Sequence, residues 1–276
     1  MKKFFPLILV LSATLAFGQA EPPAPSTAKP AGPVVPENDN SRKARALLQQ
    51  MIQALGGEAY LNIQSIEQEG RGYSYHNNQP NSGGIPFWRF YKLPDKDRFE
   101  LTKQRDIIYI NVGDKGYEKT YKGVAAMDPE QVRDYNRRHE HSLEIVLRKW
   151  LPDPTVALFY DGPAVAEQKP CDTVTLMNAK NDSVTIFIDT NHHLPVKKTF
   201  QWRDPSDNLK NTEGEVFDNW RLEDGIPTPH TILRSHNGDT TNMRFITVVR
   251  YNTNMPDTMF DANVSYDPYK HSGPRQ

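Results

Sequence analysis

Cysteine is almost missing from this 276-residue chain, which contains only Cys171. A single thiol cannot form an intramolecular disulfide, so the packed core has to hold the fold together. An excess of one charge sign is also missing, because 33 lysines and arginines face 34 aspartates and glutamates. This balance argues against a nucleic-acid binder. Beyond residue 20 no apolar run is long enough to span a bilayer, so we do not expect an integral membrane protein.

Sequence signatures of catalysis are missing as well. There is no Gly-x-Ser-x-Gly elbow, and Cys171 follows Pro170 without a recognisable partner. Gly70-Arg71-Gly72 lacks the length and the following helix of a phosphate-binding loop. We therefore assign no catalytic residue and no cofactor.

Three polar clusters are candidates for a metal or hydrolase site. His139 and His141 are two residues apart, whereas a zinc-binding pair on a helix needs a spacing of four. The segment 204–208 lacks the glycine and the glutamate of a calcium loop, which favours a hairpin tip. Asp189, His192 and His193 support a hydrolase only weakly, because their segment has ordinary turn composition. We expect no metal site.

The first twenty residues have the pattern of a signal peptide. Lys2 and Lys3 precede an apolar run, and small residues stand at the positions that signal peptidase reads, so we expect cleavage near Ala20 and a periplasmic protein. Residues 21–40 contain six prolines and are expected to form a disordered linker. We place the folded domain at residues 41–262 and a flexible tail at residues 263–276.

Two helices are predicted from apolar periodicity. The first begins at Ser41 as its N-cap, carries one apolar stripe through Leu55 and stops at Gly56-Gly57. The second begins after Asp128, with Pro129 at its first position, and runs to a stop at 151–154. The outer side of this helix is basic, as expected of a solvated face or of one that meets lipid headgroups or an acidic partner; its basic residues are Arg133, Arg137, Arg138, Arg148 and Lys149. Residues 155–160 are predicted to add a helical turn or two.

Most of the remaining chain has strand patterns separated by turn residues. Short connections require antiparallel neighbours. The predicted strands number eleven and lie at 64–76, 85–93, 97–104, 106–113, 116–122, 171–178, 183–189, 195–203, 213–222, 229–236 and 242–252.

Several of these strands are apolar on both faces, which an antiparallel sheet with one wet face does not require. Two helices are few for covering eleven strands, so a curved sheet around a partly filled hollow is the simplest interpretation. From strand parity we nominate eight ligand-binding residues that line this hollow: Trp88, Phe90, Ile108, Ile110, Ile186, Ile188, Phe200 and Trp202.

The order of these elements resembles the LolA/LolB-like periplasmic lipoprotein-sorting family and the related MucB/RseB-type sensor domains. The resemblance lies in ARALLQQMIQALGGEAYLNIQSIEQEGRG, in the helix that follows five strands, in VTIFIDTNHHLPVKKTFQWRDP and in FITVVRYNTNMPDTMFD. It implies an α+β, mainly β fold, a curved antiparallel half-barrel with the N-terminal and mid-chain helices plugging its concave side. It also implies that acyl chains are held between helices and sheet.

Two function classes remain open at this point. The first is a non-enzymatic periplasmic carrier or sensor of lipidated proteins or lipid acyl chains, with a role in outer-membrane lipoprotein sorting. The second is an envelope scaffold or regulatory module that binds a protein partner and has a filled core. Neither class involves nucleic acid. The size of the space between sheet and helices separates the two.

Overall fold

The first helix, α1 (Asp39–Ala54), begins three residues earlier than predicted. The computed structural model describes residues 33–264; the predicted signal peptide, the linker up to residue 32 and the tail from residue 265 lie outside the described residues. Asn38 is the N-cap, and Ser41 completes a capping box from the third helical position, so Ser41 as N-cap was wrong. Asparagine is at least as good an N-cap as serine, which explains the earlier start. The short α2 (Glu58–Leu61) follows.

The sheet has fourteen strands, not the eleven predicted. The three additional strands are β2, β7 and β8. The prediction of a helical turn at residues 155–160 was wrong, because the edge strand β8 begins at Ala157. The strands are β1 (Ser65–His76), β2 (Gln79–Pro80), β3 (Ile85–Lys92), β4 (Lys96–Leu101), β5 (Ile107–Val112), β6 (Lys115–Thr120), β7 (Gly123–Ala126), β8 (Ala157–Ala166), β9 (Lys169–Met177), β10 (Ser183–Asp189), β11 (Pro195–Arg203), β12 (Lys210–Glu223), β13 (Ile226–His236) and β14 (Asp239–Tyr251).

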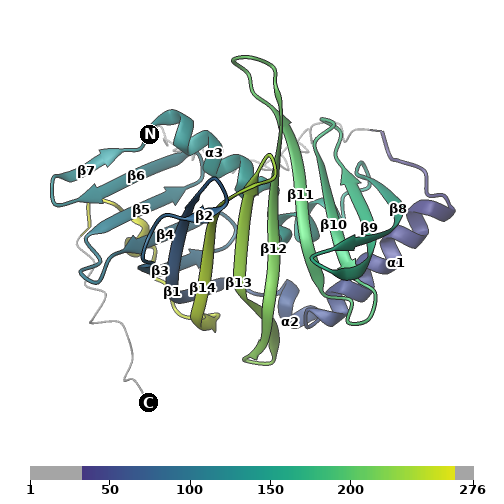
Figure 1. Cartoon of the computed structure of the whole chain (residues 1–276), viewed down its shortest axis with the longest axis horizontal. Coiled ribbons are helices and arrows are strands. Elements are labelled where there is room, and N and C mark those ends of the chain that lie inside the picture. Colours follow the sequence, from purple (N-terminus) through teal and green to yellow (C-terminus); the bar gives the residue numbers. More distant parts are fainter. Residues whose placement is uncertain (1–32, 265–276) are drawn as a thin grey trace, which may run out of the picture. The chain divides into compact units, whose positions relative to one another are not determined.

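The sheet is antiparallel, curved and open, with β7 and β8 at its two edges (Figure 1). The order is β7-β6-β5-β4-β3-β1-β14-β13-β12-β11-β10-β9-β8, and β2 pairs only with β1. The chain therefore builds one half of the sheet outward to β7 and the other half inward from β8. The helical segment between β7 and β8 has to cross from one edge to the other, which places it over one face of the sheet.

This helical segment is not the continuous helix that was predicted. Asp128 caps α3 (Pro129–Glu140) as expected, but the helix ends there. Ser142 then caps a new short helix, α4 (Leu143–Ile145), which continues as a π-helical turn, η1 (Val146–Trp150). A serine side chain that accepts from a backbone N–H favours a new helix start over continuation. His141 at the break is buried, and its ring stacks on Phe200 at 4.4 Å between centroids.

Apolar side chains form cores on both faces of the sheet. The main core lies between the sheet and the helices and contains Leu48 and Met51 of α1, Val146 of η1 and residues of both sheet halves. A smaller core on the other side joins Phe90, Ile108 and Ile110 to Met259 and Phe260 of the 3-10 helix η2 (Asp257–Phe260). The doubly apolar strands are thus explained in part by the C-terminal segment, which covers the second face.

Candidate functional site: a cavity between sheet and helices

A cavity of about 640 Å³ lies between the sheet and the helical segment. This volume is within the range of roughly 300–1,000 Å³ that is typical of small-molecule sites. Strands β1, β3, β4, β5, β12, β13 and β14 form one wall, and α3 and α4 form much of the opposite wall. Its apolar lining comprises Leu55, Tyr60, Ile63, Ile66, Tyr91, Phe99, Leu101, Met127, Leu143, Phe217, Trp220, Ile232, Met243 and Tyr251.

Two glycines of β1 lie where the strand passes β14 and the cavity, and they have different surroundings. At Gly70 a Cβ atom would lie 2.1 Å from the carbonyl oxygen of Phe245, because the β1–β14 ladder has a bulge there. At Gly72, which lines the cavity, the nearest atom to a Cβ would be the Ile85 carbonyl oxygen at 4.0 Å. Gly72 pairs with Ile85 on one side and Arg244 on the other. The missing side chain therefore leaves open space beside Arg244.

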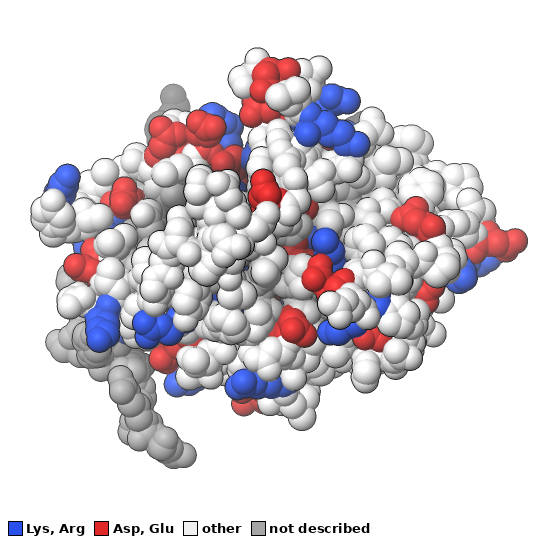
Figure 2. Space-filling view, viewed as in Figure 1, with Lys and Arg blue, Asp and Glu red and all other residues white. Residues whose placement is uncertain are grey.

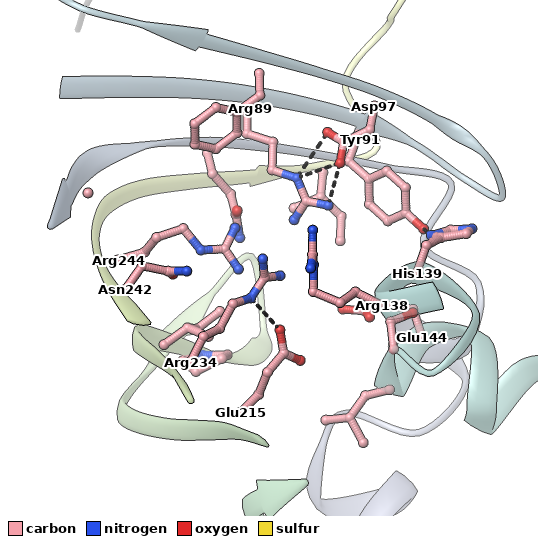
Figure 3. Close-up of a pocket in the computed structure, with 18 of the residues that line it drawn as sticks. Arg89, Tyr91, Asp97, Arg138, His139, Glu144, Glu215, Arg234, Asn242 and Arg244 are labelled. Atoms are coloured by element: carbon pink, nitrogen blue, oxygen red, sulfur yellow. Dashed lines mark hydrogen bonds and ion pairs between the residues drawn. The ribbon is translucent and has the colours of Figure 1, made fainter. Parts of the chain in front are cut away.

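Arg89 and Asp97 form one charged pair on the cavity wall (Figure 3). Arg89 Nη2 donates to Asp97 Oδ2 at 2.8 Å and Nε donates to the same carboxylate at 3.0 Å, while the Tyr135 hydroxyl donates to it at 3.1 Å. Burial disfavours the charged form of Arg89, but the Asp97 carboxylate outweighs burial and raises the pKa of Arg89. Two parallel hydrogen bonds of this kind fix the direction of the guanidinium plane.

Glu215 on β12 is the second anionic group in the wall. It accepts from Lys198 Nζ at 2.9 Å and from Arg234 Nε at 2.8 Å, and Lys198 also donates to the carbonyl oxygen of His141 at 2.7 Å. Burial opposes ionisation of Glu215, but Lys198 and then Arg234 outweigh it and hold the pKa of Glu215 well below its usual range. The carboxylate stays ionised and ties three strands to the helical segment.

Arg138 and Arg244 are less well compensated. Arg138 lies 4.0 Å from the nearest carboxylate, that of Glu213. Within residues 33–264 the Arg244 side chain has no hydrogen bond or ion pair, and its buried Nε lacks an acceptor. Burial, followed by the charge of Arg234, lowers the pKa of both residues, and that of Arg244 falls to about 9. Both still carry a positive charge at pH 7.

Tyrosines and His139 form the opposite corner of the cavity. The Tyr91 hydroxyl lies 3.3 Å from His139 Nδ1, and the Tyr135 ring stacks on His139. Burial is the largest cause that raises the pKa of Tyr91 and of Tyr135 and lowers the pKa of His139. At neutral pH this corner therefore presents neutral hydroxyls and a neutral imidazole. Glu144 is on the His139 side of the cavity (Figure 3).

None of the eight nominated residues lines this cavity. Trp88, Phe90, Ile108 and Ile110 lie in the smaller core against η2. Ile186, Ile188 and Phe200 are buried in the main core, and Trp202 packs against that core beneath the Arg137 guanidinium at 3.4 Å. On β3 and β5 the alternate residues, Arg89, Tyr91, Tyr109 and Asn111, face the cavity. Parity separates two faces of a strand but does not identify the concave one.

Sequence reasoning missed the charged residues of the cavity because they come from segments that are far apart in the chain. Arg89 stands between Trp88 and Phe90 in an apolar strand, and Arg244 follows Met243 in another. A lone arginine in an apolar strand is the one signal that pointed to a buried polar site.

The other polar clusters take ordinary structural positions. His139 faces the cavity and His141 stacks on Phe200, so the two rings diverge. Asp189 accepts from the backbone N–H groups of Asn191 and His192, as expected of a turn. In residues 33–264, no three His, Cys, Asp or Glu side chains group as metal ligands do. The basic residues of the helical segment do not share one outer face, because Arg138 enters the cavity and Arg148 donates to the Tyr60 carbonyl oxygen.

Comparison with solved structures identifies the fold. The chain is 13% identical to a DUF1329 family protein from Desulfovibrio piger, with a TM-score of 0.56 and coverage of 81% of this chain and 98% of that one. It is 12% identical to a Vibrio parahaemolyticus domain named for outer membrane lipoprotein sorting, with a TM-score of 0.54 and coverage of 81% and 98%. A LolA superfamily protein from Nitrosomonas europaea matches with 10% identity, a TM-score of 0.49 and coverage of 79% and 97%.

Both of the first two likenesses show the fold, and the second confirms the fold predicted from the resemblance to lipoprotein-sorting domains. No protein-family model matches the sequence, and no curated protein matches it. Among the described residues, no helix combines the length and the apolar character needed to cross a membrane.

Proposed function

We propose that this protein is a non-enzymatic, exported carrier or sensor that binds an acyl chain in the cavity between its sheet and its helices. The observation that carries the proposal is the cavity itself, about 640 Å³ with an apolar lining from both sheet and helices. The signal-peptide pattern of residues 1–20 supports a place in the periplasm. The lipoprotein-sorting domain of similar fold supports acyl chains of a lipidated protein or a lipid as the ligand.

Binding of this kind needs no catalytic group. Each methylene that moves from water into the apolar lining contributes about 0.8 kcal/mol. The affinity for an acyl chain therefore rises with the number of its methylenes that the cavity accommodates. The scaffold alternative assumed a filled core, so the cavity favours the carrier or sensor class.

The test uses N-phenyl-1-naphthylamine, a neutral apolar dye whose fluorescence rises on leaving water. We expect saturable uptake by the wild-type protein with one dye per chain. Gly72→Phe places a ring in the open space beside Arg244 and should weaken uptake at least about tenfold. Gly72→Val, a smaller block, should weaken it less.

Gly83→Phe is the matched control, because Gly83 is exposed and a Cβ atom there would meet nothing within 4 Å. It adds the same ring outside the cavity and should leave dye uptake unchanged. Circular dichroism of each variant establishes that it is folded. A wild-type protein without saturable uptake, or a folded Gly72→Phe variant with wild-type uptake, would contradict the proposal.

A further inference from the structure

Four arginine side chains from four elements converge on one part of the cavity. Arg89 comes from β3, Arg138 from α3, Arg234 from β13 and Arg244 from β14, and their guanidinium groups point toward a common space (Figure 3). On the intervening strand β1, Gly72 pairs with Arg244 and Gln68 pairs with Arg89, so the two arginines reach the common space from different positions along the sheet. The cluster is therefore assembled by three strands and one helix and not by one segment.

The charges around this space do not cancel. Lys198 joins the four arginines, and the carboxylates paired with these five cations are Asp97, Glu213 and Glu215. Asp134, which also lines the cavity, is paired with Arg137. Glu144 lies on the side of His139, where its charge acts on Tyr60, Tyr91 and Tyr251. Positive charge is in excess where the guanidinium groups meet.

No comparable excess of positive charge is visible on the outer surface that Figure 2 shows. On the face that Figure 2 shows, acidic and basic side chains are interspersed and no field of one sign forms. Holding several guanidinium groups together in a partly buried space is unfavourable unless an anion is shared among them. Arg244 in particular has donor groups without an acceptor among the described residues.

We propose that the arginine cluster binds the anionic head, a phosphate or a carboxylate, of an amphiphile whose acyl chain occupies the apolar part of the same cavity. The planar guanidinium group matches both oxyanions through paired N–H donors. Apolar residues lie directly beside the cluster: Ile232 pairs with Arg244, and Phe99 pairs with Arg89. The inference rests on the proposed function and adds a charge requirement to it.

The experiment measures displacement of N-phenyl-1-naphthylamine by three ten-carbon amphiphiles. Decyl phosphate and decanoate carry an anionic head, and decanol carries a neutral one. We expect the two anions to displace the dye at concentrations at least about tenfold lower than decanol. Inorganic phosphate is the fourth arm and should displace no dye at the concentrations at which decyl phosphate does.

Two variants test the residues. Arg244→Gln and Arg138→Gln should each bring the ratio between decanol and decyl phosphate to within about threefold of one. Arg250→Gln is the matched control: Arg250 is on the same strand as Arg244, but it is exposed and pairs with Glu67 and Glu69 outside the cavity. It should keep the wild-type ratio. The ratio is insensitive to a general loss of affinity, and urea unfolding establishes that each variant is folded.

The outcomes separate this inference from the proposed function. Equal displacement by decanol and the anions would overturn the arginine cluster as a headgroup site and leave acyl binding intact. Displacement by inorganic phosphate at the same concentration as decyl phosphate would assign the cluster to a free anion and overturn the amphiphile. Absence of dye uptake by the wild type would instead remove the proposed function.

Discussion

Glu215 holds together the cations that surround it. Its carboxylate is shared between Lys198 and Arg234, and Lys198 is almost completely buried. Removing the carboxylate would leave two cations without their partner in a cavity that already has an excess of positive charge. Loss of one member of a buried ion pair is among the more destabilising changes a protein can undergo.

The first prediction concerns Glu215→Gln and pH. The pKa of Glu215 is depressed in the folded protein, so its stabilising contribution is present above the unfolded pKa of about 4.3 and is lost as pH falls through the folded value. We expect Glu215→Gln to lower the free energy of unfolding at pH 7 by about 3 kcal/mol. We also expect the variant to show a shallower loss of stability below about pH 5.

Urea unfolding at pH 7, 5, 4 and 3 measures both effects. Glu140→Gln is the control, because Glu140 is exposed at the end of α3 and should change stability by less than about 0.5 kcal/mol. Parallel pH profiles for wild type and Glu215→Gln would contradict this account of the carboxylate.

At the scale of elements, α1 supplies a large part of the main core but is stabilised at its start by two polar side chains. Asn38 accepts from the backbone N–H of Ser41 at 2.9 Å, and Ser41 Oγ accepts from the backbone N–H of Asn38 at 2.9 Å. These two bonds satisfy donors that the first helical turn leaves open.

The second prediction follows from this cap. Asn38→Ala should lower the free energy of unfolding by about 1 kcal/mol, because it removes the acceptor at the N-cap. Asn38→Ser retains an acceptor and should stay within about 0.5 kcal/mol of wild type. Urea unfolding monitored by circular dichroism measures both. Equal losses for alanine and serine would show that the side-chain cap is not what fixes the start of α1.

Periodicity in the sequence predicted most of the elements because their apolar patterns are local. The stripe of α1 and the alternation of β11 are complete within a dozen or so residues. β8 was missed because it is an edge strand that pairs only with β9, and its segment 157–166 buries only Leu158 and Ala166. The break between α3 and α4 occurs because Ser142 caps a new helix. It was not predicted because the apolar stripe continues across the break.

The site could not be predicted in the same way. Which face of β3 is concave depends on where α3 and η2 pack, and both lie far away in the sequence. The fold class and the existence of a hollow were accessible from composition and strand faces. The arginine cluster depends on positions 89, 138, 234 and 244 meeting in space, and no local pattern records that.

At the scale of the whole molecule, one core joins the two halves of the sheet. Phe87 and Tyr91 before the helical segment belong to the same cluster as Ile186 and Phe200 after it. β1 pairs with β14 along most of its length, so the first and last strands in the sequence are neighbours in the middle of the sheet.

The third prediction is that the folded domain unfolds in a single step. The four tryptophans, Trp88, Trp150, Trp202 and Trp220, are distributed over both halves of the sheet and the helical segment. We therefore expect urea unfolding followed by tryptophan fluorescence and by far-ultraviolet circular dichroism to give the same midpoint. Two separate midpoints would show that the halves are independent units.

The pairing of β1 with β14 has a consequence for how the protein is made. Ile66 pairs with Tyr251. The central strands β1 and β14 therefore cannot pair fully until nearly all of the chain has been synthesised. Contacts between such remote positions form slowly. Until β14 has been made, the first strands of the sheet therefore lack the partner that joins them to the other half.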